Sequence, residues 1–102
     1  MARQTITLNG HRFEVQKSKY AKVENLARYS GRTIYDCYER PSTAKVAIYR
    51  EWEEWAYLND VQYFGVSYYN CSHFSLQGLV EHSGKLYILR ITSCHNIAYE
   101  IE

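Results

Sequence analysis

The chain opens on two short segments in which polar and apolar residues alternate. Thr5-Ile6-Thr7-Leu8 and Arg12-Phe13-Glu14-Val15 repeat with a period of two, and Asn9-Gly10 stands between them. A period of two is typical of a β-strand with one buried face, and an Asn-Gly pair tolerates the positive φ angles of a tight turn. The pattern therefore predicts a β-hairpin at the start of the domain.

The period then changes to that of a helix. Within residues 20–29, Val23, Leu26 and Ala27 follow an i, i+3, i+4 spacing, and Ser30-Gly31 supplies an end. This spacing predicts a short amphipathic helix. Residues 32–40 suit either a helical turn and a half or a strand, and we favour the helix.

The strongest helix signal covers residues 43–58, which contain both tryptophans. Pro41 prevents a helix from running through it, and Ser42 can accept hydrogen bonds from the backbone N–H groups of a first turn. The apolar residues form one stripe, which consists of Ala44, Ala47, Ile48, Trp52, Trp55 and Ala56. We expect this stripe to face the core, with Trp52 and Trp55 largely buried against a C-terminal sheet.

Beyond Asn59-Asp60 the period returns to two. Residues 61–69, 74–81 and 86–92 predict three strands, and 97–101 predict a fourth. The links are short, which favours antiparallel neighbours. The sequence thus predicts an α+β fold with an N-terminal β-hairpin, central helices and a C-terminal antiparallel β-meander packed on the tryptophan-bearing helix.

Length and composition narrow the class of protein. A chain of 102 residues fits a single domain over 1–102. The apolar runs are only a few residues long, so the sequence predicts neither a signal segment nor a membrane span. Three cysteines cannot all pair, which favours free thiols in a reducing cytoplasm.

The net charge of +1 conceals an uneven distribution. Residues 1–32 hold seven basic and two acidic side chains, whereas the remaining seventy hold five basic and nine acidic ones. A basic edge beside Tyr20 and Tyr29 can neutralise phosphates and stack on bases, and an acidic helix can attract a basic surface. The predicted binding residues are Arg12, Lys17, Lys19, Lys22 and Arg28 on the basic edge, and Glu51, Glu53 and Glu54 on the helix. The alternative is that both are solvated faces without a partner.

Tyrosine is unusually frequent, with eleven residues in the chain. An exposed surplus of tyrosine often marks a binding face, and we include Tyr68 and Tyr69 among the binding candidates. The alternative is that tyrosine occupies half-buried strand positions in place of phenylalanine.

Two Cys and His pairs are candidate chemical sites. Cys71 and His73, with Cys94 and His95, supply the ligand types of a zinc site, but adjacent residues of an extended strand point to opposite faces. A Cys–His nucleophile from the same residues lacks a recognisable orienting group, and the helix glutamates have no facing acid. The sequence therefore predicts no metal, no cofactor and no enzymatic activity.

Several short motifs carry a resemblance to a known group. They are Asp36-Cys37-Tyr38-Glu39-Arg40-Pro41-Ser42 with Lys45, Ser67-Tyr68-Tyr69-Asn70 with Phe74-Ser75, Ile91-Thr92 and Tyr99. With these the chain resembles the small, mostly uncharacterised proteins of phages, prophages and conjugative elements of Firmicutes. The resemblance implies a compact cytoplasmic protein that acts by stoichiometric binding, and inhibition of a host defence system is a frequent role of such proteins.

The leading hypothesis is therefore a non-enzymatic binding protein of a phage or mobile element. It would act as a counter-defence, anti-CRISPR-like inhibitor that docks on a host defence protein or nuclease complex in the cytoplasm of the host cell. One alternative is a sponge that sequesters a nucleotide immune signal, and another is a nucleic-acid-binding accessory factor. A second copy of the chain is a further possible partner. We expect no membrane partner.

Overall fold

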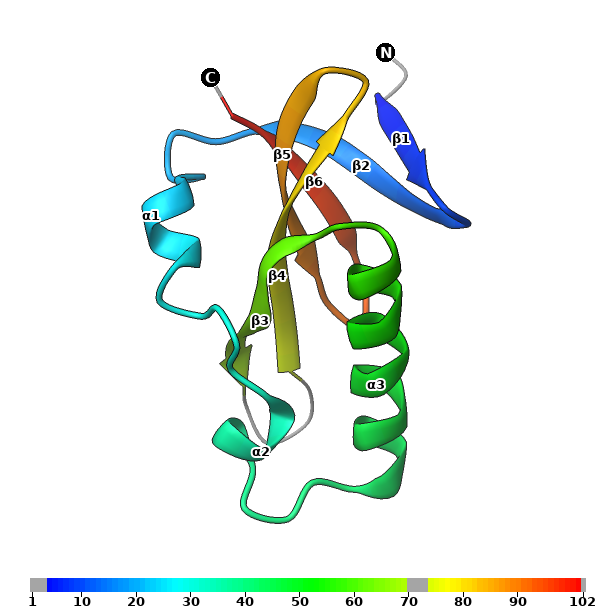
Figure 1. Ribbon diagram of the computed structural model, residues 1–102, viewed down its shortest axis with the longest axis vertical. Helices are drawn as coiled ribbons and strands as arrows, with labels where there is room; N and C mark the ends of the chain where they lie inside the picture. The colour runs from blue at the N-terminus through cyan, green and yellow to red at the C-terminus, as the bar shows by residue number, and fades with distance from the viewer. Residues whose placement is uncertain (1–3, 70–73, 102) are drawn as a thin grey trace.

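The computed structural model describes residues 4–69 and 74–101 (Figure 1). Its elements follow the chain as β1 Thr5–Leu8, β2 His11–Lys17, α1 Val23–Leu26, α2 Ile34–Cys37, α3 Thr43–Leu58, β3 Gln62–Tyr69, β4 Phe74–His82, β5 Lys85–Ile91 and β6 Asn96–Glu100. The strands form one sheet in the order β1-β2-β6-β5-β4-β3. The predicted α+β class, N-terminal hairpin and C-terminal antiparallel strands are confirmed.

Two tight turns shape the sheet. Asn9 and Gly10 between β1 and β2 have φ angles of 45° and 90°, and Ser83 and Gly84 between β4 and β5 have 53° and 80°. Positive φ at both central residues matches the right-handed twist of the flanking strands. The second turn is tighter than the four residues predicted, because His82 and Lys85 pair within the strands.

The hairpin and the meander meet in the middle of the sheet. β2 runs parallel to β6, with Glu14 opposite Ile97 and Lys17 opposite Glu100, whereas the other neighbouring strands are antiparallel. One continuous sheet therefore replaces the separate hairpin and meander that the sequence pattern suggests.

The two short helices are single turns. The helix predicted over 20–29 is restricted to α1, because only Leu26 of that turn is buried and so few apolar contacts do not hold a longer helix. α2 confirms the preference for helix in 32–40. Its start is fixed by a capping box, in which the N–H of Tyr35 donates to the hydroxyl of Thr33 and the N–H of Thr33 donates to the carboxylate of Asp36.

α3 begins as predicted, because the hydroxyl of Ser42 accepts from the N–H of Lys45 at 3.2 Å. The predicted stripe is partly wrong. Ala44, Ala47 and Ile48 are exposed, whereas the buried residues are Tyr49, Trp55 and Ala56. The helix is rotated because it buries the large ring of Tyr49, whose hydroxyl donates to the carboxylate of Glu53 at 2.7 Å.

The predicted packing of the tryptophan-bearing helix on the C-terminal strands is confirmed, because Trp55 shares one core with Leu89 and Ala98, and both tryptophan rings also contact the hairpin. Trp55 is buried with its ring centroid 5.8 Å from that of Phe13, and Trp52, which is half-buried, lies 4.3 Å from the ring of His11. Both partners belong to β2. The C-terminal strands also contact α3 through Tyr49, whose ring is 6.4 Å from that of Phe74 in β4. The helix therefore packs on the hairpin and on the C-terminal strands together.

The sheet is covered on both faces. The face under α3 carries the main core, which includes Phe13, Leu89 and Ala98. Ile88 neighbours Leu89 in β5 but points to the opposite face, where it packs with Leu26 of α1. Figure 1 shows α1 and α3 on opposite sides of the sheet. No helix in the described ranges, 4–69 and 74–101, has the length and apolar character needed to span a membrane.

The outer strand β3 is held by the segment before α2. The N–H of Gly31 donates to the carbonyl of Phe64 at 3.2 Å, and the N–H of Val66 donates to the carbonyl of Arg32 at 3.1 Å. Between these bonds, a Cβ on Gly65 would lie 1.7 Å from the carbonyl oxygen of Tyr29. Only glycine allows the two backbones to approach this closely.

Because of the buried Tyr49 hydroxyl, we expect the protein to lose stability at alkaline pH. Burial, and then the hydrogen bond to Glu53, raise the pKa of Tyr49 above its ordinary value of 10.0. A pKa raised on folding stabilises the protein fully below the unfolded pKa, and this contribution falls as the pH rises past about 10. In urea unfolding at increasing pH, Tyr49→Phe should lose less stability above that pH than the parent does. Tyr57→Phe, at an exposed position, is the control, and identical pH dependence of parent and Tyr49→Phe would contradict the assignment.

Candidate functional site

A hollow with a volume of about 610 Å³ lies between α3 and the sheet. We call it the α3 groove and define it by Lys45, Ile48 and Trp52 of α3, Phe74 of β4, and the turn 92–95 with Asn96 of β6. Its size falls within the range of about 300 to 1,000 Å³ that is usual for ligand pockets.

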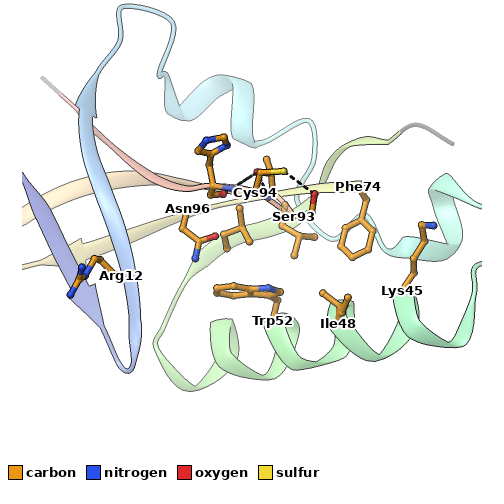
Figure 2. A pocket seen from close by; sticks show the side chains of 12 residues that line it. Arg12, Lys45, Ile48, Trp52, Phe74, Ser93, Cys94 and Asn96 are labelled. Atoms are coloured by element: carbon orange, nitrogen blue, oxygen red, sulfur yellow. Dashed lines mark hydrogen bonds between the residues drawn. The ribbon is translucent and has the colours of Figure 1, made fainter. Parts of the chain in front are cut away.

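One wall of the α3 groove is a row of helix residues. Lys45, Ile48 and Trp52 are three and four positions apart, which places them on the same side of α3. Figure 2 shows the three side chains in a row directed toward the sheet, with Phe74 and Asn96 opposite them. Ile48 is 50% exposed and Trp52 is half-buried, so the row leaves apolar surface open to a ligand.

The opposite rim is a turn held together by Thr92. Its hydroxyl oxygen accepts from the N–H groups of Cys94, at 3.3 Å, and His95, at 2.9 Å, and its own N–H donates to the carbonyl of His95 at 2.9 Å. These bonds fix the backbone of the turn. Cys94 and His95 are exposed on it, and the thiol of Cys94 lies 3.6 Å from the hydroxyl of Ser93.

The α3 groove is basic. Arg12, Lys45 and His95 line it, and none of its described lining residues is acidic. The ammonium of Lys45 lies 5.5 Å from the ring centroid of Tyr38, which positions this cation at one end. Arg12 comes from β2 and lies beyond the Trp52 end in Figure 2. An anionic group next to an apolar one is the chemistry that this arrangement favours.

The Cys and His residues considered as zinc ligands or nucleophiles are only partly within the described residues. Of the four candidate ligands, Cys71 and His73 lie outside the described residues. Within 4–69 and 74–101, no three Cys, His, Asp or Glu side chains are grouped as a metal ion would need. Of the thiols, Cys37 lies 3.7 Å from the guanidinium of Arg32, and burial raises the pKa of Cys37.

The predicted basic edge is divided between two places. Arg12 lies at the α3 groove, whereas Lys22 and Arg28 line a second hollow near α1. Lys17 is exposed at the end of β2, and the ammonium of Lys19 lies 5.3 Å from the ring of Tyr20. The structure thus brings most of the edge together with its tyrosines, but not all of it.

The three predicted glutamates are exposed on α3 but point in different directions. Each helical residue turns the side chain by about 100°, so Glu51 and Glu53 lie on opposite flanks of α3. Glu54 faces away from the sheet, and the carboxylate of Glu53 is engaged by the hydroxyl of Tyr49. For the remaining two candidates, Tyr68 and Tyr69, the backbone lies in β3, and the side chains fall outside the described part of the molecule.

Sequence reasoning did not select Lys45, Trp52, Thr92 or Asn96 as site residues. No local pattern shows that the first turns of α3 will face a turn more than forty residues further along the chain. No protein-family model, curated protein or solved structure matches the chain. Functional inference therefore depends on the geometry of the groove and on the chemistry of its side chains.

Proposed function

We propose that this is a non-enzymatic binding protein that captures an acidic segment of a partner protein in the α3 groove. The observation that carries the proposal is a basic rim around an apolar floor: Arg12 and Lys45 line the groove together with Ile48 and Trp52, and none of the described lining residues is acidic. A carboxylate beside an aromatic or aliphatic side chain complements both parts of this surface.

The floor and the rim have separate roles in the proposed binding. Burial of an apolar partner side chain on Ile48 and Trp52 supplies affinity, because both now expose apolar surface to water. Lys45 and Arg12 attract the partner's carboxylates, which gives specificity and a faster association at low salt.

The resemblance to proteins of mobile elements supports a biological role for this binding. In that role the protein is a counter-defence inhibitor in the cytoplasm of the host cell, and the acidic segment belongs to a host defence protein or nuclease complex. Binding at such a surface needs neither a cofactor nor turnover.

The test is a charge reversal in the groove. Lys45 is the third residue of α3, three positions after the capping Ser42, so Lys45→Glu creates a capping box and should keep the helix stable. Arg50→Glu, at an exposed position of α3 outside the groove, is the matched control. Lys45→Glu should weaken binding of an acidic, phenylalanine-containing peptide by about ten-fold or more, and Arg50→Glu should leave it nearly unchanged.

Calorimetry measures peptide binding, and phage-restriction assays measure inhibition by the same variants. A peptide in which lysines replace the acidic residues should not bind the parent. Equal losses for both variants would show that the net charge of the protein, rather than the groove, controls binding. If Lys45→Glu still protected the phage from restriction as fully as the parent does, the α3 groove would not be the inhibitory surface.

A further inference from the structure

A second hollow lies on the face of the sheet opposite α3. It is bounded by the segment 18–29, which includes α1, and by strands β4, β5 and β6, and its volume is about 480 Å³. We call it the tyrosine hollow, because Tyr20, Tyr29 and Tyr99 line it. It is separated from the α3 groove by the thickness of the sheet.

The register of the strands builds the floor of the tyrosine hollow. Ile88 and Arg90 are two positions apart in β5 and therefore point to the same face. Tyr99 of β6 lies opposite Ile88, and Gln77 of β4 lies opposite Arg90. Four side chains from three strands thus form one surface, with a guanidinium, an amide and a phenol ring around an apolar centre.

The wall is held to the sheet at two points. Leu26 of α1 is buried against Ile88 and Leu79, and the carbonyl of Tyr29 is packed against Gly65 of β3. Within the wall, the side-chain amide of Asn25 donates to the carbonyl of Tyr20 at 3.3 Å. These contacts keep the ring of Tyr29 and the backbone of Tyr20 beside the strand residues.

Charge is concentrated in the tyrosine hollow. Lys22 and Arg28 from the wall and Arg90 from the floor line it, and none of its described lining residues is acidic. No ion pair links any of these three cations to a carboxylate among residues 4–69 and 74–101. Three cations that line one hollow without a carboxylate partner favour an anionic ligand.

We propose that the tyrosine hollow binds a nucleotide, with the phosphate held by Lys22, Arg28 and Arg90 and the base stacked on a tyrosine ring. Tyr20 is 74% exposed, with the ammonium of Lys19 5.3 Å from the ring centroid, so much of the ring remains accessible to a base. The amides of Asn25 and Gln77 supply hydrogen-bond donors and acceptors for a base edge. This site goes beyond the proposed protein binding, which uses the other face of the sheet.

The nucleotide has two possible sources, a free mononucleotide or a single-stranded nucleic acid. A neighbouring hollow shares Ser18, Ala21 and Lys22 with the tyrosine hollow, and it adds one cation, Lys19, and one carboxylate, Glu24. A strand that extends beyond the tyrosine hollow would reach the additional cation Lys19, whereas a mononucleotide would occupy the tyrosine hollow alone. The same variants therefore need to be measured with both ligands.

The experiment compares matched variants of the intact protein. Arg28→Glu and Tyr20→Ala change the hollow, and Arg50→Glu and Tyr57→Ala make the same changes at exposed positions of α3. The probes are a fluorescein-labelled oligothymidylate followed by anisotropy, and thymidine monophosphate and inorganic phosphate followed by calorimetry. All four residues are exposed, so the variants should keep the parent's melting temperature, which circular dichroism checks.

We expect Arg28→Glu to weaken binding about ten-fold and to reduce its salt dependence. Tyr20→Ala should weaken it about five-fold or more, as the loss of one stacked base predicts. The two α3 variants should bind as the parent does. Tighter binding of the oligonucleotide than of the mononucleotide identifies a strand as the ligand, and equal affinities identify the free nucleotide.

Three results would overturn the proposal. The first is that neither nucleotide probe binds to the folded parent. The second is that inorganic phosphate binds as tightly as thymidine monophosphate and Tyr20→Ala has no effect, which would reduce the hollow to an anion site without base recognition. The third is that the α3 variants lose as much affinity as the variants of the hollow, which would place the ligand elsewhere.

Discussion

Gly65→Ala should destabilise the protein by about 3 kcal/mol or more, which can abolish folding in a small domain. The added Cβ would lie 1.7 Å from the carbonyl oxygen of Tyr29 and 2.8 Å from its carbonyl carbon. Both are backbone atoms, so a side-chain rotation cannot relieve the overlap. The segment 29–32 would have to move off β3 and would lose the bonds between Gly31 and Phe64 and between Arg32 and Val66.

Urea denaturation followed by circular dichroism measures this effect. Gly78→Ala is the matched control, because it also adds a Cβ to a buried strand glycine, but there the close atom, at 2.4 Å, is a side-chain methyl of Val61. A methyl group can move further than a paired backbone, so the control should lose less stability. A Gly65→Ala variant as stable as the parent would mean that 29–32 does not lie on β3 as described.

Trp55→Ala should cost about 3–5 kcal/mol, as truncation of a buried aromatic side chain usually does. Trp55 is only 8% exposed, and its ring contacts those of Phe13, His11 and Trp52. The substitution therefore leaves a cavity at the junction between α3 and the hairpin. Trp52→Ala should cost less, because Trp52 is half-buried and borders the α3 groove.

Chemical denaturation of both variants ranks the two positions, with Tyr57→Ala as an exposed control. A third substitution separates the packing contribution of the Trp55 ring from the effect of its polar N–H group. The buried Nε1–H of Trp55 has no acceptor among the described residues, so Trp55→Phe removes an unsatisfied donor and should cost less than the lost area alone implies. If Trp52→Ala is the more damaging truncation, the assignment of Trp55 as the core tryptophan is wrong.

The sequence predicted the features that depend on neighbouring residues. Asn9-Gly10 specified a turn because few other pairs tolerate positive φ at both positions, and Ser42 marked the start of α3 through a bond to a residue three positions away. The alternation in β4 and β5 was also sufficient to locate antiparallel neighbours. These signals act over a few residues, so the order of residues alone contains them.

The remaining features depend on contacts between distant segments. The helix α3 buries Tyr49 and leaves Ala47 and Ile48 exposed. The apolar pattern did not predict this rotation, because tyrosine is amphipathic and fits either a buried or an exposed position. The α3 groove joins the first turns of a helix to a turn between the last two strands, so Lys45 and Thr92 carried no shared sequence signal. The sequence grouped basic residues with Tyr20 and Tyr29, and the structure places Lys22 and Arg28 with both tyrosines at one hollow. Arg90 carried no such signal, because it reaches the same hollow from β5.

The parallel pairing of β2 with β6 has a consequence for how the protein folds during synthesis. Glu14 lies opposite Ile97, so the hairpin made first is joined to the sheet by the last strand of the fold. Until residues 96–100 leave the ribosome, Phe13 has no neighbouring strand on that side, and the hairpin alone is too small to be stable in water. Pairing β2 with β6 closes a long loop, and the conformational entropy of that loop is lost before the stabilising contacts form. This slows folding. The nascent chain should therefore stay protease-sensitive until β6 emerges and then become protected in one step.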